Sequence, residues 1–498
     1  MGVSRAWEAE EDRLLYRRVY DSLRRRLESG EWGPHDKLPS VRQLAARFGV
    51  NRLTALRAYR MLAEENRVYA KEKSGFYASP PVPRVGANAT DSGMDEVEPS
   101  PSGPRPGNPM SEIQSLPVEY QLSQGIVDPG LLPNLFLSEY VKSVFDLYPK
   151  LMGTYSNPQG DEELRESVAR YLTKDTRVPL SADDLVITTG GQQAIDLLAR
   201  LYIGRGDAML VERPTYSSAI DIFRQQGVRF LPVDITSAGY DLERVETLMK
   251  LHKPKAFYLN PTYHNPTGYT VPAAQRKRLV ELAERYRCLL VEDDSFREMY
   301  FGEPPPRPLY AYDTSGWVVH LRSFSKHVAP GLRVCAVAAR PGVIRPLVTA
   351  KSLADNGTPL VGQKLFLRYF ESERFGRHLE KLRIAMRLRK ETMEKELAGG
   401  GWTWDSPKGG LNLWVRLPEG LSSSELLEES LRQSVSFVPG LICDPLRETD
   451  THLRISYSFV GEAILKEGTR RLTELARRLA ERNSLGNSLG SSLGRLMS

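Results

Sequence analysis

The stretch SFSKHVAPGLR, residues 323–333, decides the fold of most of this 498-residue chain. A lone lysine behind serines is usually a surface residue, so Lys326 gains meaning only from three polar clusters that precede it. These are TGGQQ at 189–193, a segment at 260–268 that ends in NPTG, and the acidic run at 292–294. The glycine pair of the first cluster predicts a turn that exposes backbone amides at a helix N-terminus, where a phosphate can bind.

Each polar cluster follows a short apolar run. The runs lie at 185–187, 256–259, 288–291 and 318–321, and helical patterns separate them between about Val118 and Ala480. Short buried strands that alternate with helices predict a mostly parallel α/β sheet, in which ligand sites form at the carboxyl ends of the strands. We therefore expect the four clusters to meet at one edge of the sheet.

The ordered set of clusters resembles the class I and II aminotransferases, which are pyridoxal-phosphate (PLP) proteins of fold type I. The resemblance implies a Schiff base on Lys326, and PLP chemistry needs a carboxylate, Asp293, to keep the pyridine nitrogen protonated. Asn265 would donate to the ring hydroxyl and Tyr216 would stack on the ring. The residues expected around the phosphate are Gly191, Gln192, Ser323, Ser325 and Arg333.

Three further positions carry expectations from the same resemblance. Arg454, in LRISYS, would bind the carboxylate of an amino-acid ligand, and Tyr155, in YSNPQG, would cross to the cofactor phosphate of a partner subunit. The latter implies a domain-swapped homodimer. Aminotransferases usually place a tyrosine two or three residues after the ring-pairing Asp, where this chain has Ser295 and Phe296. Loss of that phenol should raise the imine pKa and make efficient transamination less expected.

The first 78 residues predict a different, α+β domain. Leu15, Val19, Leu23 and Leu27 share one helical face, and apolar residues mark two further helices at about 41–48 and 56–62. Ser40 and Asn51 are plausible N-caps, Gly49 fits the corner between the helices, and residues 68–78 predict a hairpin. Three helices and a hairpin make a winged helix-turn-helix.

Residues 37–65, KLPSVRQLAARFGVNRLTALRAYRMLAEE, resemble the GntR-type winged-helix signature. A recognition helix inserts its first turns into the major groove, where arginine reads guanine and threonine can bind phosphate. Two departures affect turns: His35 or Asn66 stands where the family has glycine, and the wing keeps only Gly75. The expected DNA-contacting residues are Ser40, Arg42, Asn51, Arg52, Thr54, Arg57, Lys71, Lys73 and Gly75.

The two domains are separated by a segment rich in proline, glycine and serine. We therefore predict a DNA-binding domain at 1–78, a linker at 79–115, a PLP domain with a smaller C-terminal α+β subdomain at 116–482, and a disordered tail at 483–498. This order of domains resembles the MocR-type transcription regulators, a subgroup of the GntR family.

Composition limits the classes of protein. Residues 1–78 hold sixteen Lys and Arg against eleven Asp and Glu, most of the net charge of +6, as suits a phosphate-backbone binder. No apolar stretch is long enough for a membrane helix and the N-terminus holds no secretion signal, so we expect a cytoplasmic protein. Three cysteines without a CxxC pair suggest neither disulfides nor a metal site.

The sequence leaves three alternatives open. A regulator would sense an amino acid, an amine or PLP itself, with an effector amine displacing Lys326; an active aminotransferase, of 2-aminoadipate or another type, would carry an added DNA-binding module; a chance pairing of motifs would give neither. Fused domains favour the regulator. Relatives that read GABA have arginine two residues after the stacking tyrosine, where this chain has Ser218, so GABA is not the first expectation.

Overall fold

A computed structural model describes residues 19–27, 29, 31–33, 35–64, 67–71, 75–79 and 108–496. The chain divides into two compact units, Met1–Pro99 and Ser100–Ser498, which are described separately. The predicted positions Leu15 and Lys73 and the segment 80–107 of the predicted linker lie outside the described residues.

The first unit is the predicted winged helix. A helix at 19–27 is followed by α2 (Val41–Phe48), α3 (Arg52–Glu64) and an antiparallel hairpin of β1 (Val68–Lys71) and β2 (Gly75–Ala78). Leu23, Leu44, Tyr59 and Leu62 are fully buried in its core. Burial of these side chains from all three helices is what fixes the helix-turn-helix.

Local capping sets the corner between α2 and α3 as predicted. Ser40 forms a capping box with Gln43, Gly49 ends α2 in the left-handed conformation at φ 63°, and Asn51 Oδ1 accepts from the Thr54 amide at 2.7 Å. His35 also adopts a left-handed conformation, at φ 69°. A histidine therefore holds the backbone conformation for which the resemblance expects glycine, and the turn is retained.

The second unit is built on an eight-stranded sheet of order β4-β11-β10-β9-β8-β5-β6-β7. Strands β10, β9, β8, β5 and β6 run parallel, whereas β11 and β7 are antiparallel to their neighbours, so the predicted mostly parallel sheet is confirmed. The strands are β4 (Leu185–Thr189), β5 (Ala208–Arg213), β6 (Arg229–Thr236), β7 (Gly239–Tyr240), β8 (Ala256–Leu259), β9 (Leu289–Asp293), β10 (Val318–Ser323) and β11 (Val334–Ala338).

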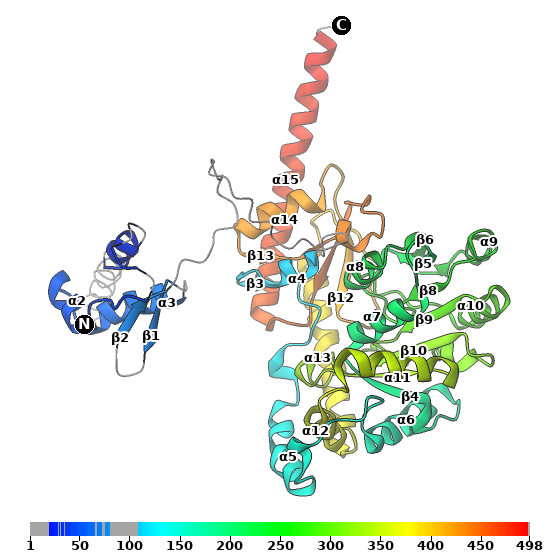
Figure 1. The fold of residues 1–498 in the computed structure, drawn as a ribbon. Helices are drawn as coiled ribbons and strands as arrows, with labels where there is room; N and C mark the ends of the chain where they lie inside the picture. Colours follow the sequence, from blue (N-terminus) through cyan, green and yellow to red (C-terminus); the bar gives the residue numbers. More distant parts are fainter. Residues whose placement is uncertain are drawn as a thin grey trace, which may run out of the picture. The chain divides into compact units, whose positions relative to one another are not determined.

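Helices cover both faces of this sheet (Figure 1). Successive residues of β8 face opposite layers: Tyr258 packs in one apolar cluster and Phe257 in the other. The first cluster takes side chains from α7 (Gly191–Tyr202), α8 (Ser217–Gln225) and α11 (Pro341–Asp355). The second takes them from α6 (Glu162–Thr176), α9 (Leu242–His252), α10 (Ala273–Tyr286), α12 (Leu360–Phe370) and α13 (Glu373–Leu397).

The predicted smaller α+β subdomain follows α13. Its sheet has the order β12-β15-β14, and a second, two-stranded sheet pairs β13 with β3, which comes from the start of the unit. These elements are β3 (Tyr120–Gln121), β12 (Asn412–Arg416), α14 (Ser423–Arg432), β13 (Val435–Ser436), β14 (Val438–Pro439), β15 (His452–Ser456) and α15 (Glu462–Leu496). The pairing of β3 with β13 brings the segment after the linker against this subdomain.

Two predicted boundaries differ from the structure. The predicted linker ends in a helix, α4 (Pro109–Gln114), because Asn108 caps it, Pro109 starts it and Met110 is buried. The predicted disordered tail is instead a continuation of α15 to Leu496 (Figure 1). Each glycine in this segment costs about 1 kcal/mol in a helix, but extension of an already packed helix avoids the cost of nucleation. Among the described residues no helix is long and apolar enough to span a membrane.

Candidate functional site

One pocket at the carboxyl ends of the strands gathers nine of the ten residues predicted for the cofactor. It is lined by Lys326, Asp293, Asn265, Tyr216, Gly191, Gln192, Ser323, Ser325 and Arg333, together with Ile126, Ile195, Asn260, Ser295, Phe296 and Pro330. Strands β4, β9 and β10 each end at this pocket. The site thus lies where a parallel sheet is expected to bind its ligand.

The end of the pocket next to α7 suits a phosphate. Gly190 has φ 81°, and a Cβ at this position would lie 2.4 Å from Nη2 of Arg333, so the first glycine of the pair makes room for the arginine. The Oγ of Ser325 is buried and has no hydrogen-bond partner among the described residues. An orphaned hydroxyl beside an arginine and a helix N-terminus is the donor set that a phosphate needs.

Two ionisable groups in the pocket have shifted pKa values. Burial, with Arg454 and Arg333 nearby, lowers the pKa of Lys326 to about 8, which favours the neutral, nucleophilic amine. Burial also raises the pKa of Asp293, although hydrogen bonds from Ser295 and Tyr258 oppose the shift.

The hydrogen bonds around Asp293 add residues that the sequence did not reveal. Tyr258 donates to one carboxylate oxygen at 2.8 Å and Ser295 donates to the other at 2.5 Å. Asn260 donates to the Asp293 carbonyl and accepts from the backbone amide of Asn265, at 2.9 Å. Asn260 therefore holds the acidic segment and the NPTG segment together, and Ser295 acts on Asp293.

Arg454 lies in a second pocket, which shares Lys326, Tyr216 and Asn265 with the first. Its guanidinium is 2% exposed and donates to the Ser123 carbonyl at 2.6 Å and to Asn265 Oδ1 at 3.2 Å. The Nε atom has no hydrogen-bond partner among the described residues. Burial lowers the pKa of Arg454, as expected for a cation without a carboxylate beside it.

Tyr155 does not line the pocket of its own chain. It is 86% exposed, as are to a lesser degree Met152, three residues before it, and several apolar side chains of α5 (Asn134–Leu147). A tyrosine that served its own subunit's cofactor would have to point into the pocket. Its outward position agrees with the role expected from the resemblance.

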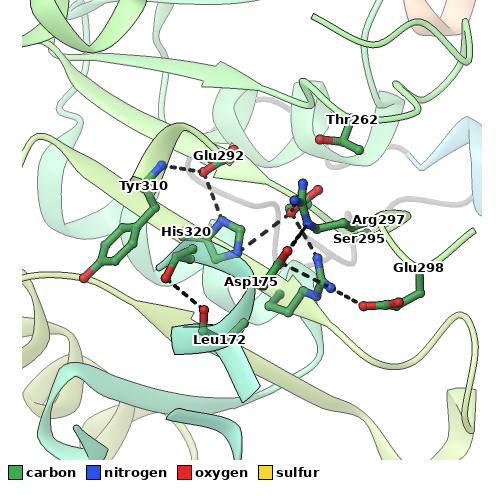
Figure 2. A network of polar contacts seen from close by, with 12 residues as sticks. Leu172, Asp175, Thr262, Glu292, Ser295, Arg297, Glu298, Tyr310 and His320 are labelled. Atoms are coloured by element: carbon green, nitrogen blue, oxygen red, sulfur yellow. Dashed lines mark hydrogen bonds and ion pairs between the residues drawn. The ribbon is translucent and has the colours of Figure 1, made fainter. Parts of the chain in front are cut away.

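A buried polar network lies next to the pocket and joins β9, β10, α6 and the residues that follow β9 (Figure 2). His320 contacts Glu292 at 3.0 Å, Arg322 contacts Asp294 at 3.0 Å, and Arg297 contacts Asp175 at 2.7 Å. Burial would raise the pKa of Glu298, but Arg322, the hydrogen bond from Tyr171 and Arg383 together outweigh it, and the pKa falls to about 2. The network holds the segment that presents Asp293 and Ser295.

In the first unit most of the predicted DNA-contacting residues lie at the surface. Thr54 is the exception: it is 4% exposed, and its hydroxyl donates to Oδ1 of the capping residue Asn51 at 2.9 Å, so it is not presented to a groove in this structure. The Nζ of Lys71 lies 4.6 Å from the centre of the Tyr77 ring, which orients the wing. The exposed residues are Ser40, Arg42, Asn51, Arg52, Arg57 and Lys71, and Gly75 is half-buried.

The pocket residues fit a pyridoxal phosphate. A buried lysine with a lowered pKa can bond the aldehyde, a buried carboxylate can pair with the ring nitrogen, and the serines, arginine and glycine turn can hold the phosphate. Fold and site together define the class: a PLP-type aminotransferase fold joined to a winged helix-turn-helix.

Comparison with known proteins places the chain in a family. The profile of aminotransferase class I and II matches residues 149–472 and that of the bacterial regulatory proteins of the gntR family matches residues 15–78. The chain belongs to the aminotransferase class I and II family and carries a GntR-type helix-turn-helix in front of it.

Two aminotransferases and one regulator illustrate what the chain is similar to, and of these three only the regulator is matched over nearly the whole chain. The chain is 35% identical to 2-aminoadipate transaminase of Thermus thermophilus over 70% of its length and 87% of the enzyme. It is 28% identical to the uncharacterized HTH-type transcriptional regulator YisV of Bacillus subtilis, over 93% of its length and 96% of the regulator. Kynurenine aminotransferase of Pyrococcus horikoshii, solved with PMP, superposes with a TM-score of 0.70 at 30% identity, over 74% of this chain and 93% of that one.

Proposed function

We propose that the protein is a PLP-dependent transcription regulator that binds an operator through its winged helix and senses an amino acid or amine in its aminotransferase-like pocket. One observation carries the proposal: a single chain joins a helix-turn-helix to a pocket that contains nine of the ten expected PLP-binding residues. Relatives named as HTH-type regulators extend over both parts of the chain. Because an operator is its target, we place the protein in the cytoplasm.

When bound, PLP supplies an aldehyde that forms a reversible imine with a primary amine. Lys326 would hold it, and an effector amine would replace the lysine there, passing its two protons to the leaving lysine nitrogen. Arg454 would bind the effector's carboxylate, because this buried cation has no carboxylate partner among the described residues. A ligand that binds two conformations of the protein with different affinities can then shift operator binding.

We also propose that the protein forms a homodimer. Leu135 on α5 is 80% exposed and Met152 is 75% exposed, and both lie close in sequence to Tyr155. Apolar side chains of this size at a surface mark an interaction site. A second copy that covers them would bring Tyr155 toward the partner's cofactor phosphate. Light scattering should give about twice the monomer mass of 56.1 kDa, and a stable monomer would contradict this part of the proposal.

An active aminotransferase is the second candidate, supported by the 35% identity to 2-aminoadipate transaminase. Ser295 and Phe296 oppose it, since they stand where aminotransferases place a phenol that lowers the imine pKa. A sensor and an aminotransferase differ in how the absorption spectrum of the PLP-loaded protein should change with time after an amino acid is added.

The test is an absorption spectrum of the full chain with PLP, followed by addition of amino acids and amines. A Schiff-base band that Lys326→Ala abolishes, and that shifts and then stays, supports a sensor. PLP capture should accelerate with pH around 8, the pKa of the buried lysine. Steady formation of a keto acid would instead identify an enzyme, and a band that survives in the Lys326→Ala variant would contradict the assigned site.

A further inference from the structure

Helix α4, at the end of the predicted linker, lines the pocket that holds Arg454. Asn108, Met110, Ser111 and Gln114 line the pocket that holds Arg454, and this pocket continues into the one that holds Lys326. The six-residue helix therefore forms a wall of the effector site, although its composition suggested a linker.

Arg454 is connected to α4 in two ways, through a shared backbone carbonyl and through a direct contact with Met110. The Ser123 carbonyl accepts hydrogen bonds both from Arg454, at 2.6 Å, and from Gln114 Nε2, at 3.1 Å. The Sδ of Met110 lies 3.7 Å from the Arg454 Nη2. Thioether sulfur is a weak acceptor, so a carboxylate that reaches this guanidinium replaces a poor partner with a strong one.

The charges of this pocket restrict what the rest of the ligand can be. Besides Lys326 and Arg454, its lining in the described part of the chain contains no acidic or basic side chain; the other polar groups are mainly amides and hydroxyls. The carboxylate next to the amine takes Arg454, which leaves no cation for a second carboxylate and no anion for a second amine. A second charge would therefore find no counter-charge in this lining, whereas a neutral polar group can be hydrogen-bonded there.

Ser111 is the group on α4 best suited to make that hydrogen bond. It lines the pocket and its side chain is exposed, and no hydrogen bond of its hydroxyl to the other described residues is found. Asn108 caps α4 through its oxygen at 3.0 Å, and its amide also lies in the lining. Both groups can donate, and Ser111 can also accept.

We propose that α4 contacts the side chain of the effector and thereby selects an α-amino acid whose side chain is uncharged and forms hydrogen bonds, such as a carboxamide or a hydroxyl. This inference rests on the proposed sensor function. Because α4 begins at Pro109, near the start of the aminotransferase-like unit at Ser100, ligand contacts with α4 act on the first described helix of that unit.

The test is a spectral titration of the PLP-loaded full chain with amino acids that differ in one group. L-glutamine should bind about tenfold more tightly than L-glutamate or L-2-aminoadipate, because the described lining offers a second carboxylate no cation, whereas a carboxamide can hydrogen-bond to Ser111. L-alanine, which lacks a polar side chain, serves as the reference. Hydrogen exchange of residues 109–115 should slow when the favoured ligand binds.

Two variants separate recognition by α4 from other causes. Ser111→Ala should weaken the favoured ligand by about five- to tenfold, as expected for one hydrogen bond, and leave L-alanine unchanged. Glu112→Gln is the matched control, since Glu112 is exposed on the same helix and does not line the pocket. Its affinities should equal those of the wild type.

The outcomes distinguish this inference from the proposed function. Equal or tighter binding of glutamate or 2-aminoadipate overturns the selection by α4 and leaves the sensor function standing. The same holds if Ser111→Ala weakens L-alanine and L-glutamine equally. A Schiff-base band that responds to no amino acid overturns both the sensing of amino acids and the role of α4.

Discussion

Two buried arginines of the aminotransferase-like unit have opposite surroundings. Arg322 is 1% exposed and contacts Asp294 at 3.0 Å, with Glu298 on its other side. Arg454 is 2% exposed and has no carboxylate partner among the described residues. Burial tends to lower both pKa values, but the carboxylates raise that of Arg322, whereas that of Arg454 is lowered.

The difference separates a structural charge from a binding charge. Around Arg322 the protein itself supplies the counter-charges, the carboxylates of Asp294, Glu298 and Asp175, before any ligand arrives. Around Arg454 the protein supplies a carbonyl, an amide oxygen and a thioether, all of them neutral. A buried cation left in neutral surroundings gains most when an anion binds.

Removal of Arg322 should give the largest effect. Arg322→Met leaves Asp294 and Glu298 buried without their main cation, so the free energy of unfolding should fall by about 3–5 kcal/mol. Urea denaturation of the apo protein measures it. A fall of less than about 1 kcal/mol in the free energy of unfolding would show that the ion pairs of Arg322 do not stabilise the fold.

Removal of Arg454 should change ligand affinity and leave the stability of the protein nearly unchanged. Arg454→Met relieves an unpaired buried charge, so the stability of the apo protein should stay within about 1 kcal/mol of the wild type. Amino-acid affinity should fall roughly 100-fold, equivalent to about 3 kcal/mol for a charged hydrogen-bonded pair. PLP capture by Lys326 is the control, and it should persist. Unchanged amino-acid affinity would remove Arg454 from the site.

The fold and the cofactor pocket could be predicted because their signals are local in sequence. The polar clusters follow apolar runs directly, and strand ends of one sheet meet at one edge. The helix caps at Ser40 and Asn51 could be predicted for the same reason, because a capping side chain bonds to a backbone amide within three residues of it. The buried position of Thr54 could also have been found, since it stands four residues before the buried Ala58 on α3.

What the sequence did not show depends on distant contacts. Met110 is buried by Trp414, Val438 and neighbouring residues, about 300 positions away, so a segment rich in proline and serine conceals a packed helix. The donor role of Tyr258 requires β8 and β9 to be neighbours in the sheet. The contact between Arg454 and Ser123 has the same cause, because it joins the first and last parts of the unit.

The network around Arg322 should also be sensitive to acid. The pKa of Glu298 in the folded protein, about 2, lies below its ordinary value of 4.5, so its ion pairs stabilise the fold above pH 4.5 and are lost as the pH falls toward 2. A shift of this size corresponds to about 3 kcal/mol. Glu298→Gln should flatten the fall in stability between pH 4.5 and 2, measured by denaturation. An unchanged pH profile would contradict the pairing.

The smallest expected effect concerns Asp293, the carboxylate of the pocket that receives only neutral side-chain donors. Ser295→Ala removes the 2.5 Å hydrogen bond, which stabilises the ionised carboxylate, and should raise the pKa of Asp293 further. Because the ionised carboxylate pairs with the protonated ring nitrogen, PLP affinity should then be lost at a higher pH on its acid side. Equilibrium titration of PLP against pH measures the shift.

Ser295→Thr is the matched variant, since it keeps the hydroxyl and should retain the wild-type profile. If the Ala and Thr variants shift equally, the hydroxyl is not the cause and the effect lies in packing beside Phe296. If neither shifts, Tyr258 is the hydrogen-bond donor that opposes the effect of burial on the pKa of Asp293. In that case Tyr258→Phe should raise the pH at which PLP affinity is lost on the acid side. The hydrogen bond that controls the pKa of Asp293 would then come from β8 and not from the segment that contains Ser295.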